Sequence, residues 1–285
     1  MSSAGISERN YAGTVLVLGA TGKTGRRIVE RLEAKGVPTR RGSRSAVPSF
    51  DWNNEANWDE VLAGVEAVYI NYAPDLAMPG ATDSIQALVD RAKQHGVKHL
   101  VLLSGRGEEE AQACERIIQN SGIDWTIVRA SWFNQNFSEG AFVEMVQAGQ
   151  ITLPAVDTPE PFVDVDDIVD IAAAALTEPG HAGELYELTG PRLLTLADVA
   201  VEISRASGRE VQFVPVPHDA FVAEVAASGA PQDVVWMLDY LFATVLDGRN
   251  AYLTDGVQRA LGREPKDFSD YAREISATGI WREVA

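Results

Sequence analysis

Val15-Leu16-Val17-Leu18-Gly19-Ala20-Thr21-Gly22-Lys23-Thr24-Gly25 is the stretch that decides the fold of this chain. Its first four residues form an apolar run with a β-branched bias, which is typical of a parallel strand buried on both faces. Apolar residues then recur at helical spacing from 26 to 34. The three glycines permit a sharp turn, close approach of a pyrophosphate to the backbone, and close packing of helix on strand. The stretch therefore predicts a dinucleotide-binding turn, and a tight turn without a ligand is the alternative.

Strands and helices alternate regularly beyond this turn. Further strands are expected at 37–41, 67–70, 98–103 and 125–129, and helices at 58–62, 85–94 and 109–120. Such an alternation indicates βαβ units. The chain is therefore predicted to be an α/β protein built on a Rossmann-type, doubly wound parallel sheet.

The regular alternation of strands and helices ends after Arg129. Strands are expected at 162–165 and 185–188, and helices at 142–147, 168–176, 196–206, 220–227, 233–246, 255–261 and 268–275. Either Asp166 or Asp167 is expected to cap the helix that starts at 168, and a cation site formed with Asp164 is the alternative. We expect a loose tail at 1–13 and a Rossmann domain at 14–190, with substrate-domain insertions near 135–160. A smaller, mostly helical substrate domain is expected at 191–285.

The charge balance limits the class of partner. Lys and Arg together number 24 and Asp and Glu 41, which gives a formal net charge of −17. Nucleic acids and anionic membrane surfaces both require a basic face, so neither is an expected partner. A small-molecule substrate is expected instead, since a few arginines and backbone N–H groups still bind a small anion on an acidic protein. Monomer and homodimer both stay open.

Cysteine and histidine give no sign of a metal site or a disulfide. Cys114 is the single cysteine, which excludes an intramolecular disulfide and a cysteine-rich zinc site. His95 and His99 are four residues apart, but Gly96 interrupts the helix between them, so we expect no metal.

The first eleven residues lack an apolar signal region, and no apolar run approaches the ~18 residues of a membrane span. The expected location is cytoplasmic.

The end of the second strand indicates which dinucleotide binds. NAD enzymes usually place a carboxylate there for the ribose hydroxyls, whereas this chain has Arg40-Arg41-Gly42-Ser43-Arg44. Arg44, with Ser43 beside it and Lys23 or Arg41 nearby, is expected to hold a 2′-phosphate through charge-assisted hydrogen bonds. NADP(H) is therefore the predicted cofactor, with a solvated basic turn as the alternative.

An ordered set of short motifs over most of the chain resembles the NmrA-like family of atypical short-chain dehydrogenases. The motifs are residues 14–32, Gly42-Ser43-Arg44-Ser45, Phe50-Asp51-Trp52, 96–104, 122–129, 132–137 and FVDVDDI at 162–168. Beyond residue 190 the chain is similar to the ergot-alkaloid agroclavine/festuclavine dehydrogenase branch, through Thr189-Gly190-Pro191 and the helical tail. The resemblance implies an NADP(H)-binding Rossmann domain and a smaller substrate domain. Members include quinone and iminium reductases and also NADP(H)-sensing regulators without turnover.

The resemblance also implies which residues bind the cofactor. Asp51 and Trp52 are expected to flank the adenine, and the nicotinamide end is expected near Ser131 and the motif that follows it, Trp132, Phe133 and Asn136. The cofactor contacts carried over by motif are Gly19, Thr21, Gly22, Lys23, Thr24, Gly25, Ser43, Arg44, Asp51, Trp52, Asn71, Tyr72, Ala73, Ser104 and Gly105.

One departure from the usual short-chain dehydrogenase pattern limits the chemistry. None of the seven tyrosines is followed by Lys four residues later, and Ala111 stands where isoflavone-reductase-like relatives keep a lysine. A lysine in that pair lowers the phenol pKa for proton transfer to a carbonyl oxygen. An iminium needs no proton on accepting hydride, and solvent can protonate a hydroquinone anion. The missing pair therefore favours a quinone, imine or enone acceptor.

Candidate catalytic and substrate-binding residues come from the strand ends, where such sheets bind ligands. Tyr72 is the candidate proton donor, with Ser104 or Asn136 as hydrogen-bond partners, and a pure packing role is the alternative. Arg106 is expected to hold a substrate oxyanion or a cofactor phosphate, with a surface position as the alternative. An apolar wall for an aromatic substrate, or alternatively core packing, is expected of Trp132, Phe133 and Trp236.

Two functions follow from these expectations. The first is an NADPH-dependent oxidoreductase that transfers hydride to a small conjugated or aromatic acceptor. The second is a catalytically silent, NADP(H)-sensing regulator of the NmrA type, which the missing Tyr–Lys pair keeps open.

Overall fold

The structure is a computed structural model that describes residues 13–140, 142–154 and 157–282. The chain divides into two compact units. The first unit holds the described residues up to Ser104, then Glu110–Val128 and Val169–Tyr186; the second holds Gly105–Glu109, Arg129–Ile168 and the rest from Glu187. The tail expected at 1–13 lies, apart from Gly13, outside the described residues.

The first unit is built on a six-stranded sheet with the order β2-β1-β3-β4-β5-β7. The pairs β1–β2, β1–β3 and β3–β4 are parallel. This order and the flanking helices confirm the predicted doubly wound α/β fold. The strands are β1 (Thr14–Leu18), β2 (Thr39–Gly42), β3 (Val65–Ile70), β4 (His99–Gly105), β5 (Asp124–Ala130) and β7 (Glu184–Leu188).

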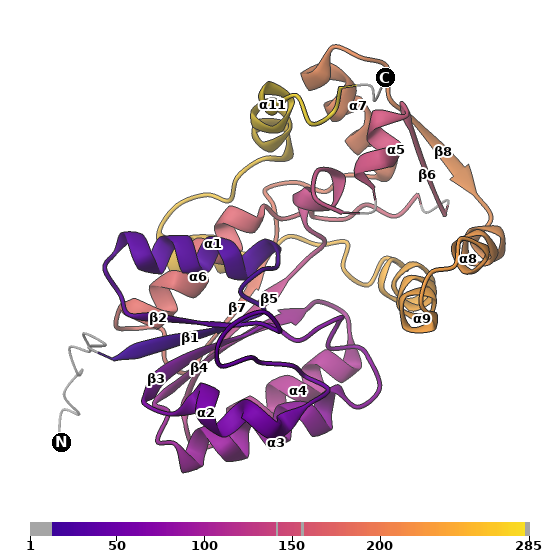
Figure 1. Ribbon diagram of the computed structural model, residues 1–285. Coiled ribbons are helices and arrows are strands. Elements are labelled where there is room, and N and C mark those ends of the chain that lie inside the picture. The colour runs from indigo at the N-terminus through magenta and orange to yellow at the C-terminus, as the bar shows by residue number, and fades with distance from the viewer. Residues whose placement is uncertain (1–12, 141, 155–156, 283–285) are drawn as a thin grey trace. The chain divides into compact units, whose positions relative to one another are not determined.

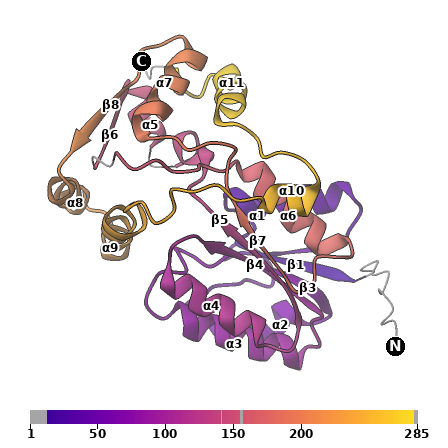
Figure 2. The same ribbon diagram turned by 180° about the vertical axis from the view of Figure 1, so that it is seen from behind.

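Helices cover both faces of this sheet. Figure 1 shows α1 and α6 on one face and α2, α3 and α4 on the other, and the opposite view in Figure 2 agrees. Their bounds are α1 (Lys23–Ala34), α2 (Trp58–Leu62), α3 (Ala81–Gln94), α4 (Glu109–Gln119) and α6 (Val165–Thr177), with a 3₁₀ turn η1 (Glu55–Asn57) before α2.

Burial explains why the first strand and helix form where they do. Every residue from Val15 to Leu18 is fully buried, as a strand covered on both faces must be. Helix α1 buries Ile28, Val29 and Leu32, which share one side of the helix. The helix begins at Lys23, three residues before the expected start, because Gly22 already serves as its N-cap.

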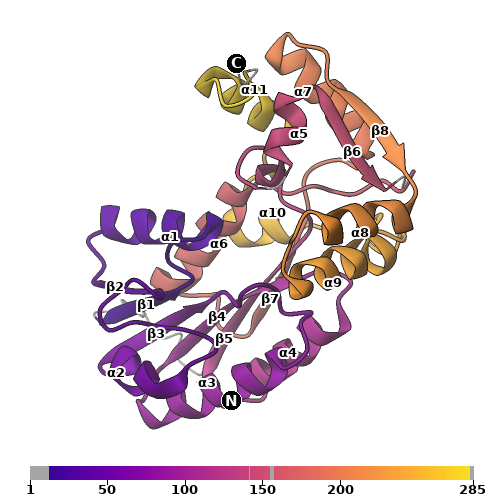
Figure 3. The same cartoon turned by 45° about the vertical axis from the view of Figure 1, so that its right-hand side comes forward.

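The second unit combines a small sheet with mostly short helices. Strands β6 (Gln150–Pro154) and β8 (Gln212–Val216) pair in parallel and lie side by side in Figure 3, as do α8 and α9. Its helices are α5 (Val143–Gln147), α7 (Leu196–Ser207), α8 (His218–Ala227), α9 (Gln232–Tyr240), α10 (Gly256–Leu261) and α11 (Phe268–Thr278), with a 3₁₀ turn η2 (Asn134–Phe137) and a π-helical segment η3 (Leu241–Val245). No helix within the described ranges is both long and apolar enough to cross a membrane.

Two expectations for this region are wrong, and a third is refined. Residues 162–165 form no strand: Val163 makes a single bridge to Phe133, and Val165 already belongs to α6. The cap of α6 is Asp164 rather than Asp166 or Asp167, because its carboxylate accepts the N–H of Asp166 at 2.8 Å. The single helix expected at 233–246 changes to π-helical hydrogen bonding at its end.

Candidate functional site

The glycine turn after β1 is closed by backbone contacts that leave little room for side chains. Gly19 has a φ of +68°, and a Cβ there would lie 2.8 Å from Asn71 Nδ2. The N–H of Gly22 donates to the Gly19 carbonyl at 2.9 Å. A Cβ at Gly25 would lie only 2.1 Å from that same carbonyl oxygen. The turn thus requires glycine at 19 and 25, and it brings the predicted cofactor residues Gly19 and Asn71 together.

The start of α1 has the chemistry of an anion site. Its N-cap, Gly22, has no side chain that could accept from the first N–H groups, and the first turn contains Lys23 and no acidic residue. These N–H groups and the helix dipole attract negative charge. Thr24 is buried and its hydroxyl accepts from Tyr69 at 2.9 Å, and a contact from Thr24 to the cofactor stays a prediction. The bare backbone at Gly22 fits a pyrophosphate.

The three arginines around the end of β2 have different surroundings. Arg40 donates to the carbonyls of Val61 and Ala63 at 2.6 and 2.8 Å, and Arg41 pairs with Glu33 at 2.8 Å. The Arg41 charge, which the sequence suggested as a second partner for the 2′-phosphate, is therefore already paired in the structure. Arg44 is exposed and makes no ion pair within the described residues. Its guanidinium group is the one at this strand end that remains available for a phosphate.

Aromatic rings gather beside the ends of β2 and β3. The Trp52 indole N–H donates to the Asn71 carbonyl at 3.2 Å, and its ring centroid lies 4.8 Å from that of Tyr72. Three predicted cofactor residues thus meet in the first unit. Asp51 accepts the N–H of Asn53 at 3.0 Å, and Ala73 is exposed. Tyr72 packs against the core here, so the packing role has direct support, while its role as a proton donor stays a prediction.

Ser104 already commits its proton. The buried hydroxyl donates to Glu115 Oε1 at 2.6 Å, within the first unit. It can accept a hydrogen bond from another group, but its own proton points to the carboxylate. In the second unit, Gly105 lies against the carboxyl group of Glu108, which a Cβ at 105 would approach to 2.3 Å. A backbone contact from Gly105 to a cofactor stays a prediction.

Arg106 is buried at the centre of a polar cluster in the second unit. Its guanidinium donates to Glu187 at 2.9 Å and to Ser131 at 2.8 Å. Longer bonds run to the carbonyls of Asn250 at 3.3 Å and Tyr252 at 3.4 Å. The surface alternative is therefore wrong, since the residue is 2% exposed. Most of its N–H groups hold the protein together, which leaves little capacity to bind a substrate oxyanion.

The predicted aromatic wall is divided between two local clusters of the second unit. Trp132 packs on Phe242 with ring centroids 5.3 Å apart, whereas Trp236, 38% exposed, stacks on Tyr240 at 5.4 Å. Phe133, the N-cap of η2, and Asn136, within η2, are both half-buried. A cavity of about 540 Å³ lies next to the first cluster and is lined by Pro154, Pro215, Val216, Pro217, His218, Phe242 and Ala243.

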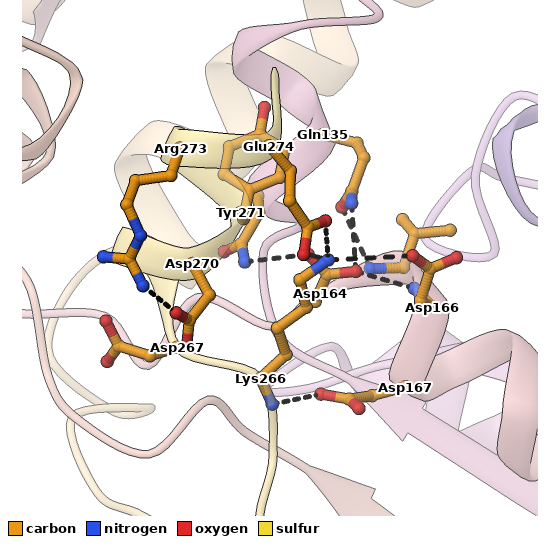
Figure 4. A network of polar contacts seen from close by, with 12 residues as sticks. Gln135, Asp164, Asp166, Asp167, Lys266, Asp267, Asp270, Tyr271, Arg273 and Glu274 are labelled. Carbon is orange, nitrogen blue, oxygen red and sulfur yellow. Dashed lines mark hydrogen bonds and ion pairs between the residues drawn. The ribbon is translucent and has the colours of Figure 1, made fainter. Parts of the chain in front are cut away.

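The aspartates at the start of α6 lie beside a lysine. Figure 4 shows the Lys266 ammonium beside Glu274 and near Asp164 and Asp166. Its nitrogen lies 2.5 Å from the Glu274 carboxylate and 3.8 Å from that of each aspartate. Asp167 accepts the backbone N–H of Lys266 at 2.8 Å. Among the described residues, no group of three His, Cys, Asp or Glu side chains is arranged to hold a metal. This cluster therefore joins the start of α6 to the segment before α11.

Glu160 is a buried carboxyl group that the sequence did not single out. Its backbone exchanges two hydrogen bonds of 2.9 Å with Leu194, and the residue is 1% exposed. Neither carboxyl oxygen has a hydrogen-bond partner among the described residues. Burial raises the pKa of Glu160 to about 7, against the opposing effect of the Arg106 charge and with added repulsion from Asp247. Nothing in Pro-Glu-Pro distinguishes this glutamate in the sequence.

Comparisons with known proteins agree with these features. The model of the NmrA-like family matches residues 12–272. Agroclavine dehydrogenase of Claviceps fusiformis is 31% identical over 95% of this chain and 100% of its own length. The NADPH-dependent quinone oxidoreductase of Escherichia coli, solved with NADPH, has a TM-score of 0.77 at 22% identity and covers 92% of this chain and 99% of its own. The negative transcriptional regulator Nmra, solved with NAD, has a TM-score of 0.70 at 18% identity. The match covers 94% of this chain and 96% of the regulator's chain.

Proposed function

The chain belongs to the NmrA-like family, and on that premise we propose that it is an NADP(H)-dependent oxidoreductase that reduces a small conjugated or aromatic acceptor. The observation that carries the proposal is the closed glycine turn with an uncapped, acid-free helix start behind it. When bound, NADPH supplies the hydride, and the protein orients it and excludes water. Relatives named as a dehydrogenase and a quinone oxidoreductase support the redox function.

The two units have different proposed roles. The first unit binds the pyrophosphate, 2′-phosphate and adenine of the cofactor, and the second unit supplies the substrate-binding residues. The turn from Gly19 to Gly25 holds the pyrophosphate, Arg44 the 2′-phosphate and Trp52 the adenine, as the local contacts of the first unit allow. The remaining cofactor residues carried over by motif stay part of the same proposal.

The class of acceptor follows from the missing Tyr–Lys pair. Ser104 directs its proton to Glu115, and Tyr72 packs on Trp52. A quinone, an imine or iminium, or an enone fits a site that lacks the usual proton-donating pair, because these acceptors depend less on a strong acid than a simple ketone does. The proposal therefore names these classes and no individual compound.

The second candidate function is an NADP(H) sensor without turnover. The likeness to the solved negative transcriptional regulator Nmra and the missing Tyr–Lys pair favour it. The decisive experiment follows NADPH absorbance with a panel of quinones, imines and enones. Consumption with at least one acceptor class supports the oxidoreductase. Tight NADPH binding with no consumption across the panel, together with a co-purifying protein partner, supports the sensor.

Arg44→Gln is expected to weaken NADPH binding about tenfold to a hundredfold, with NADH binding nearly unchanged. The physical reason is the loss of the charge-assisted hydrogen bonds to the 2′-phosphate, worth roughly 1.5–3 kcal/mol. Calorimetry with both nucleotides measures the effect. Arg41→Gln is the matched control and should change the NADPH/NADH ratio little, because Arg41 already pairs with Glu33. An unchanged ratio in Arg44→Gln would show that this arginine does not select NADP(H).

A further inference from the structure

Tyr252 presents an exposed aromatic ring that is unusually well fixed for a surface residue. Half of the residue, 50%, is exposed. Its hydroxyl donates to Glu187 Oε1 at 2.8 Å, and the Arg106 guanidinium carbon lies over the ring, 4.4 Å from its centroid. The ring is therefore tethered at its edge and covered by a cation on one face.

The groups that hold this ring are themselves fixed. Glu187 accepts from Arg106 at 2.9 Å and pairs with Arg129 at 3.2 Å. Burial acts to raise the pKa of Glu187, but the hydrogen bonds from Tyr252 and Arg106 and the two arginine charges outweigh it, so this pKa lies below its ordinary value. Glu187 is thus a carboxylate at neutral pH and a constant acceptor for the Tyr252 hydroxyl.

The backbone around Tyr252 is also tied to Arg106. The N–H of Tyr252 donates to the Asn250 carbonyl at 2.8 Å, and the Asn250 amide donates to the Arg106 carbonyl at 3.2 Å. Arg106 in turn donates to the Tyr252 carbonyl at 3.4 Å. Ring, hydroxyl and main chain are all held, so little conformational entropy remains to be lost when a ligand stacks on the ring.

Three residues of the cluster come at or just after the ends of strands in the sequence. Arg106 directly follows β4, Arg129 lies near the end of β5, and Glu187 lies near the end of β7. In doubly wound sheets, ligands bind outside the carboxyl ends of the strands. Leu253, the next residue in the chain, is also exposed, at 48%.

We propose that Tyr252 is a substrate-stacking platform, one face on Arg106 and the uncovered face against a flat, conjugated acceptor. This inference rests on the proposed oxidoreductase function and narrows its substrate class to planar ring systems. The platform contributes to binding and orientation and transfers no proton, since its hydroxyl is committed to Glu187. Offset stacking of two rings adds to the binding that the buried area alone provides.

The first test measures binding without turnover. 1,4-Naphthoquinone is titrated into the NADP⁺-loaded full chain, which cannot reduce it, and cyclohexane-1,4-dione is the non-planar comparison. Tyr252→Leu should weaken naphthoquinone binding about tenfold, from stacking and lost apolar contact together, and leave the affinity for NADP⁺ unchanged. Tyr252→Phe and Tyr252→Trp, which keep a ring, should stay within about threefold of the wild type. Val201→Ala, at an exposed apolar position on α7, is the surface control.

Specific outcomes overturn this proposal without touching the proposed function. Equal naphthoquinone affinity in Tyr252→Leu and wild type, or equal losses for the planar and non-planar probes, would remove the stacking role. Thermal melting shows whether Tyr252→Leu is folded. If it is not, naphthoquinone affinity is compared among Tyr252→Phe, Tyr252→Trp and Tyr252→His, which tests whether the affinity increases with the size of the ring. If the wild type reduces no acceptor but still binds naphthoquinone through Tyr252, the oxidoreductase proposal fails and the platform stands.

Discussion

Gly25→Ala is expected to lower the free energy of unfolding by ~3 kcal/mol and to abolish measurable NADPH binding. An alanine normally stabilises a helix relative to glycine by about 1 kcal/mol. The change in stability expected here therefore has the opposite sign. The reason is steric: the new Cβ would lie 2.1 Å from the Gly19 carbonyl oxygen, 2.7 Å from its carbon and 3.0 Å from the Ala20 Cα. All three are backbone atoms, so no flexible side chain can move away. Urea unfolding with and without NADPH measures both effects.

Gly22→Ala is the matched control, three residues earlier in the same turn. Its Cβ would lie 3.3 Å from the Gly19 carbonyl oxygen and 3.7 Å from Asn71 Nδ2, so the fold can accept it with a small adjustment. The added methyl group would stand where the pyrophosphate approaches the backbone. We therefore expect nearly unchanged stability and at least about tenfold weaker NADPH binding. If Gly22→Ala bound NADPH as the wild type does, the phosphates would not lie on this turn.

Glu160→Gln is expected to stabilise the protein at pH 8 and to have a much smaller effect at pH 5. The pKa of this buried carboxyl is raised to about 7 in the folded chain, from an ordinary value of 4.5. The folded state therefore binds more protons than the unfolded state between these values, and wild-type stability falls as the pH rises through this window. The loss amounts to about 3 kcal/mol above pH 7, since one pKa unit corresponds to roughly 1.36 kcal/mol.

Unfolding free energies at pH 5, 6, 7 and 8 test this expectation. The difference between Glu160→Gln and wild type should grow from about 1 kcal/mol at pH 5 to about 3 kcal/mol at pH 8. Glu264→Gln, at an exposed position, controls for the removal of one negative charge. Parallel pH profiles for Glu160→Gln and wild type would contradict the prediction and would mean that water or a ligand satisfies the Glu160 carboxyl in solution.

Much of the cofactor turn could be predicted because its physics is local. The run from Val15 to Leu18, the glycines after it and the amphipathic helix behind it each depend on neighbours a few residues away. The same locality explains why the alternation of strands and helices up to Arg129 predicted the sheet. The sequence pattern did not show which arginine at the end of β2 stays available for a phosphate. That depends on a tertiary contact, because Arg41 pairs with Glu33 on α1 and Arg44 does not.

The second unit depends on contacts that no local pattern encodes. Strand β6 is completed by β8, whose first residue, Gln212, lies 62 positions after Gln150, and neither segment alone reads as half of a sheet. Asp164 caps α6 by accepting the N–H of Asp166, whereas Asp167 accepts from Arg263 and from the backbone N–H of Lys266, residues far along the chain.

The sequence by itself determined the dinucleotide turn, the doubly wound sheet and the absence of a Tyr–Lys pair, since each is written in residues close together in the chain. Only the tertiary structure decided that Arg106 is a buried support and that the Glu160 carboxyl has no hydrogen-bond partner among the described residues. The same holds for Tyr252, whose ring lies against Arg106 and whose hydroxyl donates to Glu187. These properties come from burial and from pairings across up to 146 positions, as between Arg106 and Tyr252. Folding creates such environments, and residue type alone does not specify them.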